Sequence, residues 1–166
     1  GHGEHRPRFT ITRADGTPGD YGQAILAMAE AAKVCGATGF MMWCQCVAGL
    51  YMQASGNPAL DGERLARHVR GETLGGTGLS NPMKSFAQIE ALLLKATPVD
   101  GGYLVNGTLP WVSNLAADHY FGAIASVQTE AVGDGACAGR EMMFMLRCNA
   151  PGVTLKSCPE FSGMEG

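Results

Sequence analysis

The stretch Gly101–Tyr120, GGYLVNGTLPWVSNLAADHY, decides the fold that the sequence predicts. Tyr103–Val105 is a short apolar run with strand propensity, and the pair Asn106-Gly107 follows it directly. An Asn-Gly pair supplies the two positive φ angles of a type I′ turn and is therefore a strong hairpin signal. We predict that the chain turns at this pair and returns as a second strand over Leu109–Ser113.

The predicted return strand carries a flat ring and a hydroxyl. Trp111 and Ser113 are two residues apart, and alternate residues of a strand lie on the same face. Together they suit a planar heteroaromatic ligand, because the indole packs on the ring and the hydroxyl bonds a ring nitrogen or oxygen. On the hairpin alone, the alternative is that Trp111 is an ordinary core residue, which is the commoner role of tryptophan.

Composition narrows the class of protein. The 166 residues carry a net charge of −3, and since no basic stripe stands out we expect no nucleic-acid partner. The hydrophobic fraction of 46% is enough for a core, in one domain or two small ones. The six cysteines show neither CxxC nor zinc-ligand spacing, so we expect reduced thiols in a cytoplasmic protein. The N-terminus has no apolar signal-peptide core.

The segments before residue 74 are predicted to be helical. Val34–Ala54 is uncharged and long enough to span a bilayer, but Gln45, Gln53 and three glycines favour a buried helical hairpin, so no membrane span is expected. Residues 1–19 are predicted to be loop with one short strand. The expected elements are that strand, Phe9–Thr12, and the helices Tyr21–Cys35, Phe40–Ala54 and Asp61–Arg70, of which Phe40–Ala54 is apolar nearly all round and hence buried.

Short strands are predicted to dominate the rest of the chain. A Gly-rich change of composition at Gly71–Gly78 places a boundary between a helical segment, 1–74, and a β domain, 75–166. Besides the hairpin, strands are expected over Ala91–Ala96, His119–Val127, Glu141–Cys148 and Val153–Lys156, with a turn at Asn149–Gly152. The predicted class is therefore α+β, with a small antiparallel β-barrel or sandwich after the helices.

The residues of the hairpin resemble a known pattern. Tyr103 to Gly107 (YLVNG), Pro110 to Asn114 (PWVSN) and Ala117-Asp118 are similar to the middle-domain motif of the acyl-CoA dehydrogenase family. In that family the tryptophan packs on the isoalloxazine of FAD, and the Ser/Thr hydroxyl bonds the flavin near N5. The resemblance implies that FAD is the cofactor and that Trp111, Val112 and Ser113 contact it.

A second motif resembles the flavin loop of the same family. Residues 79–82, Leu-Ser-Asn-Pro, are similar to its L-T-E-P, whose first two positions bond the flavin pyrimidine, which implies cofactor roles for Leu79 and Ser80. Asn81 replaces the usual Glu, and the Gly-Ser-Asp that follows in the family is missing. Ser85 is the nearest replacement for the serine beside the pyrophosphate. Lys84 could offer charge to a phosphate, and the alternative is an exposed loop lysine.

The resemblance covers about residues 20–166, including a short helix and Gly-Glu at 56–72 and a Gly-Met-Glu-Gly element at 163–166. It implies a fragment with a shortened N-terminal helical domain and no C-terminal helical bundle. The activity implied is α,β-dehydrogenation of an acyl-CoA thioester, in fatty acid metabolism. The catalytic base is expected outside this chain, since no carboxylate stands at a matching position among Glu63, Glu72, Glu90, Glu130, Glu141, Glu160 and Glu165. The chain alone is predicted not to oxidise acyl-CoA.

The family also implies partners. A homotetramer and an electron-transfer flavoprotein are expected by resemblance alone. Met42, Trp43 and Cys46 are candidates for the wall of an acyl pocket, with plain core packing as the alternative. Two other functions stay open: a flavin-dependent monooxygenase of the same fold, and a flavin-free, non-catalytic scaffold.

Overall fold

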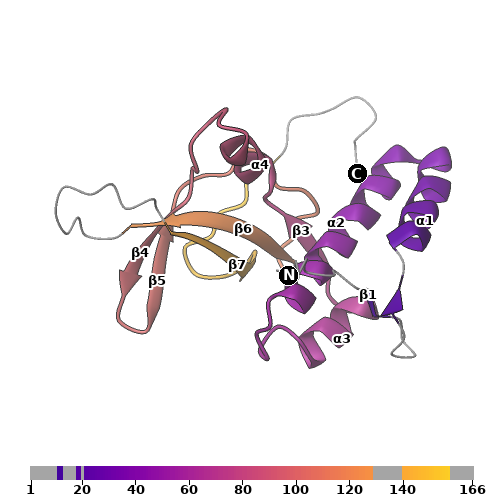
Figure 1. Ribbon diagram of the computed structural model, residues 1–166, viewed down its shortest axis with the longest axis horizontal. Coiled ribbons are helices and arrows are strands. Elements are labelled where there is room, and N and C mark those ends of the chain that lie inside the picture. Colours follow the sequence, from indigo (N-terminus) through magenta and orange to yellow (C-terminus); the bar gives the residue numbers. More distant parts are fainter. Residues whose placement is uncertain (1–10, 13–17, 20, 129–139, 158–166) are drawn as a thin grey trace, which may run out of the picture.

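A computed structural model describes residues 11–12, 18–19, 21–128 and 140–157. Helices come first and a sheet follows, which confirms the α+β class (Figure 1). The elements are β1 (Ile11–Thr12), β2 (Pro18–Gly19), α1 (Tyr21–Val34), α2 (Gly36–Ala54), α3 (Glu63–Val69), β3 (Gly75–Thr77), α4 (Ser80–Phe86), β4 (Lys95–Val99), β5 (Gly102–Asn106), β6 (Tyr120–Val127) and β7 (Glu141–Arg147).

The three predicted N-terminal helices are confirmed with shifted ends. Helix α2 starts at Gly36, so Cys35 alone separates it from α1. The prediction that α2 is buried all round is wrong, because its buried residues are Gly39, Cys44, Ala48 and Met52. The last three are four residues apart and form one stripe on the helix. No helix among the described residues combines the length and apolar character needed to cross a bilayer.

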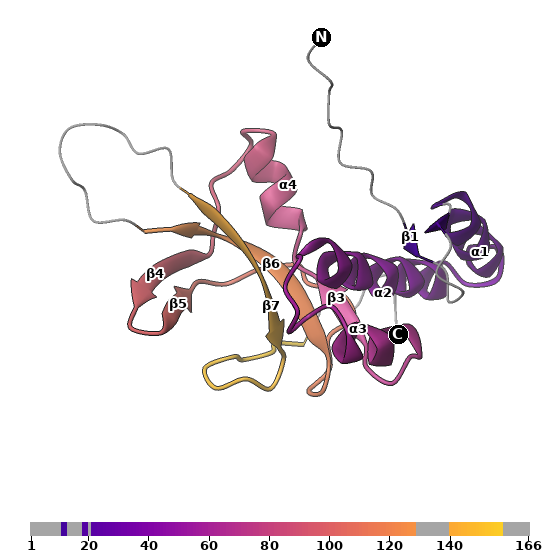
Figure 2. The same cartoon turned by 60° about the horizontal axis from the view of Figure 1, so that its bottom comes forward.

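The packing of α2 explains this pattern. Its stripe faces the sheet, where Ala48 lies so close to Gly75 that a Cβ added to that glycine would stand 2.6 Å from the alanine methyl. At its other end, Gly39 lets α2 approach Ala32 of α1. The helices gather at one end of the sheet and the β4–β5 hairpin projects from the other, as both views show (Figures 1 and 2).

The predicted antiparallel barrel is wrong. Strands β3 to β7 form a five-stranded mixed sheet that stays open, with β6 at its centre, and β1 and β2 pair with each other in a separate two-stranded sheet. One edge of β6 pairs antiparallel with β7 from Tyr120 to Ser126. The other edge pairs in parallel with β3 near its start and with β4 near its end. Parallel neighbours need a crossover connection. The chain leaves β3 and reaches β6 only after α4, β4 and β5, and it leaves β4 and reaches β6 only after β5 and residues 107–119. The local strand signals do not contain that geometry.

The predicted hairpin is also wrong in its position. Strands β4 and β5 form the hairpin, and the pairing of Val99 with Gly102 puts the turn at Asp100-Gly101, with φ +78° at Gly101. Asn106 ends β5, opposite Lys95. Gly107 has φ +139° and passes so close to Leu93 that a Cβ would meet its carbonyl oxygen. The chain therefore does not return as a strand over 109–113.

Of the remaining strand predictions, two are confirmed and two are not. Strands β6 and β7 are confirmed, as is the turn at 149–152, where Val153 N donates to Ala150 O at 3.0 Å. The strand expected over 91–96 begins only at Lys95, and 153–156 is not a strand. Small buried residues of β4 and β6 make the sheet core with Leu94: Ala96, Ala123 and Ala125. Residues 9, 20, 129–139 and 158–166, on which other predictions fell, lie outside the described residues.

Candidate functional site

The segment 109–114 lies alongside β3, although it is not a strand. Ser113 forms an isolated antiparallel bridge with Thr77, and Asn114 Nδ2 donates to Gly75 O at 2.8 Å. A Cβ added to Gly76 would fall on the Ser113 carbonyl oxygen, and one on Gly78 would stand 2.8 Å from Leu109 Cδ1. Glycines in β3 therefore allow the close approach. Since Leu79 and Ser80 directly follow this strand, the two predicted flavin motifs are brought to the same place.

Polar contacts from α2 hold the bridge in position. Tyr51 and Thr77 share a hydroxyl–hydroxyl hydrogen bond of 2.6 Å, and the Tyr51 ring occupies space that a side chain at Gly122 would fill. The Cys44 thiol is hydrogen-bonded to the Ser113 side chain. Burial raises the pKa of Cys44 to about 11, and the contact with Ser113 opposes that shift. Cys44 is thus a neutral thiol at pH 7 and acts as a packing residue beside Ser113.

Trp111 presents its ring to the surface. The residue is 46% exposed, so the alternative of an ordinary core tryptophan is wrong. Val112 and Ser113 are half-buried. The common face predicted for Trp111 and Ser113 depended on a strand that does not form. What remains is an accessible indole two residues from a hydroxyl that α2 and β3 hold in place.

Residues 80–86 form helix α4 where a loop was predicted. Leu79 precedes the helix, Ser80 is its exposed first residue, and Ser85 is half-buried near its end. Five residues at 100° each put the two serines on different sides of α4. Lys84 Nζ lies 3.7 Å from Glu90 Oε1, so this lysine has a carboxylate partner within the chain. The contribution of Ser85 to a phosphate site stays a prediction.

Asn81 has a role that the sequence did not predict. It is 2% exposed, and its amide nitrogen donates to Glu90 Oε1 and to Ala91 O, both at 2.9 Å. Its carbonyl accepts the Leu93 N–H at 3.0 Å. Asn81, which stands where the family has glutamate, is therefore a buried clamp, a side chain whose hydrogen bonds hold α4 to residues 90–93. Its partners lie nine to twelve residues ahead, and nothing in the local pattern marks them.

The acyl-pocket candidates lie on other parts of α2. At 100° per residue, Met42 and Cys46 point roughly opposite to Cys44, which faces Ser113. Trp43 is stacked on Phe40, with ring centroids 5.4 Å apart, and is 37% exposed. The structure does not bring these three residues together with Trp111–Ser113. Their role in an acyl pocket stays a prediction.

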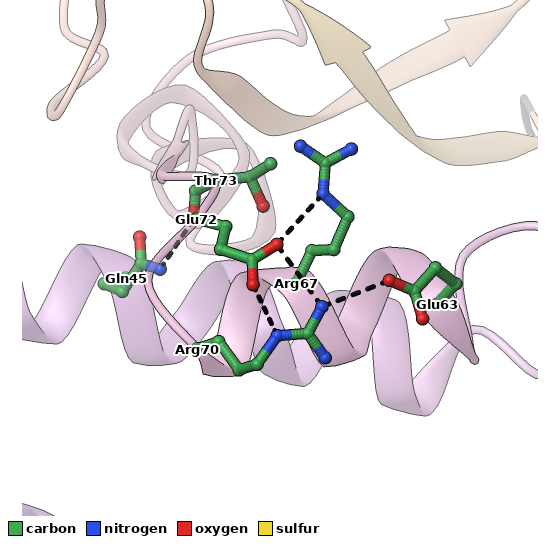
Figure 3. A network of polar contacts seen from close by, with 6 residues as sticks. All are labelled: Gln45, Glu63, Arg67, Arg70, Glu72 and Thr73. Atoms are coloured by element: carbon green, nitrogen blue, oxygen red, sulfur yellow. Dashed lines mark hydrogen bonds and ion pairs between the residues drawn. The ribbon is translucent and has the colours of Figure 1, made fainter.

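The glutamates considered as a catalytic base are, where the structure describes them, paired with other side chains or exposed. Glu63 and Glu72 both pair with Arg70, which holds the pKa of Glu72 below its usual value (Figure 3). Glu90 accepts from Asn81, and Glu141 is exposed at the start of β7. Glu130, Glu160 and Glu165 lie outside the described residues. No group of three or more potential metal ligands occurs in the described part of the chain, and its four cysteines are free thiols.

The hydroxyl of Tyr51 should make the free energy of unfolding depend on pH. Burial raises its pKa to about 12 from the ordinary 10, although the Thr77 hydroxyl opposes the shift. Between these values the unfolded tyrosine loses its proton while the folded one keeps it, so the unfolding free energy should fall as the pH rises through this window. In Tyr51→Phe, denaturant unfolding should show a shallower fall, while the exposed Tyr103→Phe control should match wild type. Equal slopes for Tyr51→Phe and wild type would contradict the assignment.

Two curated proteins are similar to part of this chain. Benzylmalonyl-CoA dehydrogenase of Aromatoleum aromaticum is 24% identical over 105 residues, which cover 63% of this chain and 26% of that protein. Mitochondrial isovaleryl-CoA dehydrogenase of Oryza sativa subsp. japonica is 28% identical over 111 residues, covering 67% and 26%. No protein-family model matches the chain. The chain spans about a quarter of the length of these relatives, whose names suggest an acyl-CoA dehydrogenase-like oxidoreductase.

Proposed function

We propose that this chain is the flavin-binding part of an acyl-CoA dehydrogenase. The observation that carries the proposal is the meeting of two motifs at one strand: the segment with Trp111 and Ser113 lies along β3, and Leu79-Ser80 continues from that strand. The two relatives, both named as CoA dehydrogenases, support the same class of activity.

The residues present suit an isoalloxazine ring. Trp111 is 46% exposed, and an indole at the surface is a side chain on which a flat, apolar ring system can pack. Ser113, whose side chain is hydrogen-bonded to Cys44 and whose backbone forms a bridge with Thr77, would donate its hydroxyl hydrogen to the flavin near N5, and the backbone of Leu79 with the Ser80 hydroxyl would bond the pyrimidine edge. Bound FAD supplies the hydride acceptor. The protein contributes orientation, which depends on the fixed position of Ser113.

The base that removes the α-proton is proposed to lie outside this chain. The described glutamates Glu63, Glu72 and Glu90 are bound to arginine, asparagine or lysine side chains. An acyl-CoA thioester is the proposed substrate. We also propose that the protein forms a homotetramer and passes electrons to an electron-transfer flavoprotein.

Flavin content is the decisive measurement. Full-length wild-type protein should show flavin absorbance after reconstitution with FAD, and anaerobic addition of acyl-CoA thioesters of increasing chain length should bleach it with one of them. Trp111→Ala should weaken FAD binding by about tenfold or more, since it removes a stacking face of about 1–3 kcal/mol. The control Trp43→Ala removes the other tryptophan, which stacks on Phe40 of α2, and should keep full flavin content.

Each outcome has a definite meaning. Flavin bands that no thioester bleaches would overturn the dehydrogenase and favour the monooxygenase class. Protein that binds no FAD would overturn the flavin site and favour the non-catalytic scaffold. Equal flavin loss in Trp111→Ala and Trp43→Ala would show that the effect comes from damaged folding.

A further inference from the structure

A second site lies beside the start of β3, whereas Leu79 and Ser80 lie beyond the end of that strand. An open pocket of about 320 Å³ is formed by α3, the turn before it, and the starts of β3 and β6. Its polar lining is Arg64 and Arg67 of α3, Glu63, Thr73 and the half-buried Tyr120. Thr73 precedes β3, whereas Leu79 and Ser80 follow that strand, and neither Trp111 nor Ser113 is among the residues that line the pocket.

Two arginines and one glutamate, Arg64, Arg67 and Glu63, are the charged residues that line this pocket. Among the described residues, Arg64 has no carboxylate within ion-pair distance; its guanidinium lies 5.3 Å from the centre of the Tyr120 ring. Arg147 lies 5.5 Å from the same ring. Arg67 uses only Nε to reach Glu72 Oε2, at 3.4 Å, and its two terminal nitrogens point away from that carboxylate (Figure 3).

The two carboxylates nearby are already neutralised. Arg70 Nη2 lies 3.1 Å from Glu63 Oε1, and Arg70 Nε lies 2.6 Å from Glu72 Oε1. Glu63, the carboxylate of the pocket lining, is thus paired with Arg70, which is not part of the lining, and the lining keeps two arginines, Arg64 and Arg67. The donors of Arg64 and the terminal nitrogens of Arg67 are thus available to an anion.

Thr73 supplies an independent indication of a ligand. Thr73 is one of the residues that line the pocket, and its hydroxyl is buried and has no hydrogen-bond partner. A buried hydroxyl without a partner costs stability, so such groups in a pocket wall mark places where a ligand atom can bind. The backbone around it is fixed, because Gln45 Nε2 donates to Thr73 O at 3.1 Å and Gln45 Oε1 accepts the Gly75 N–H at 2.9 Å (Figure 3).

We propose that this pocket binds the phosphate group of a small phosphorylated molecule. Guanidinium groups bond phosphate oxygens in pairs, which suits Arg64 and the free end of Arg67, and the Thr73 hydroxyl donates a further bond. The volume exceeds that of one phosphate and falls in the range of small-molecule sites, so the pocket has room for the organic part. The site is separate from the flavin residues and does not depend on their role.

The test is a calorimetric titration of the full-length protein with inorganic phosphate and with pyrophosphate, at an ionic strength held constant with chloride. Titrations with and without saturating FAD keep the flavin site apart from the pocket. Arg64→Gln should raise the dissociation constant at least about tenfold, since it removes a charged hydrogen bond to the anion. Lys33→Gln, which removes an equal charge from exposed α1, is the matched control and should bind phosphate as wild type does.

Thr73→Val keeps the side-chain shape and removes the hydroxyl. It should weaken phosphate binding while leaving the thermal midpoint of the phosphate-free protein unchanged or higher, because no hydrogen bond is lost in that state. Three results would overturn the site: no saturable binding, equal weakening by Arg64→Gln and Lys33→Gln, or phosphate binding that FAD abolishes. Phosphate binding retained by Trp111→Ala would support the pocket even if the flavin proposal fails.

Discussion

Gly76→Ala is expected to lower the free energy of unfolding by about 3 kcal/mol or more and to abolish flavin binding. Gly76 is buried in β3, and a Cβ there would fall on the carbonyl oxygen of Ser113. The obstacle is backbone, so no side-chain rotation relieves it. The segment that carries Trp111 and Ser113 must move away from β3, and the bridge to Thr77 is lost with it.

Gly102→Ala is the matched control for this experiment. Gly102 is also a strand residue of the same sheet, but nothing lies within 4 Å of the position where its Cβ would stand. Denaturant unfolding and flavin absorbance of the two variants should therefore differ sharply. A Gly76→Ala protein as stable and as rich in flavin as Gly102→Ala would show that the approach of residues 109–114 to β3 is wrong.

Asn81→Asp is expected to cost about 3 kcal/mol of stability, from two lost hydrogen bonds and a buried carboxylate. The new side chain still accepts from the Leu93 N–H, but it can no longer donate to Ala91 O or to Glu90. It also puts a negative oxygen where the amide nitrogen now stands, 2.9 Å from Glu90 Oε1. Urea or thermal unfolding at pH 7 measures the loss.

A second substitution tests the cause of that loss. Glu90→Gln in the Asn81→Asp background removes the facing charge and supplies an amide donor, so the double variant should recover about half of the lost stability. Asn57→Asp is the exposed control: Asn57 Oδ1 accepts from Ala59 N, which a carboxylate also does, and stability should stay near wild type. A double variant no more stable than Asn81→Asp would disprove the pairing of Asn81 with Glu90.

The elements that the sequence predicted correctly are those with a strong local signal. Helices α1 to α3 follow the spacing of apolar residues, and β6 and β7 are largely apolar, β-prone runs. The N-caps of α2 and α3, Cys35 and Gly62, make no side-chain capping bond. The proximity of the two flavin motifs was implied only by family resemblance, and β3 realises it through its glycines. That resemblance also implied FAD, which the absorbance experiment tests.

The prediction placed the hairpin turn wrongly because the chain offers two similar turn signals six residues apart. Both Asp100-Gly101 and Asn106-Gly107 suit a tight turn, and local propensity cannot choose between them. The choice was made by pairing: β4 and β5 match five residues around Asp100-Gly101. Gly107 serves instead to pass close to Leu93, a contact that no local pattern contains.

The sequence by itself determined the helices, the two long strands, the α+β class and the residues that resemble a flavin site, because these depend on periodicity and residue type within short windows. Tertiary structure alone decided that the sheet is mixed and open, that Asn81 is a buried clamp, and that Arg64, Arg67 and Thr73 meet at one pocket. Each of these features depends on which distant segments the fold brings together. The free energy of such contacts comes from the burial of side chains and from the pairing of hydrogen-bonding groups. Neither burial nor pairing is visible before the chain has folded.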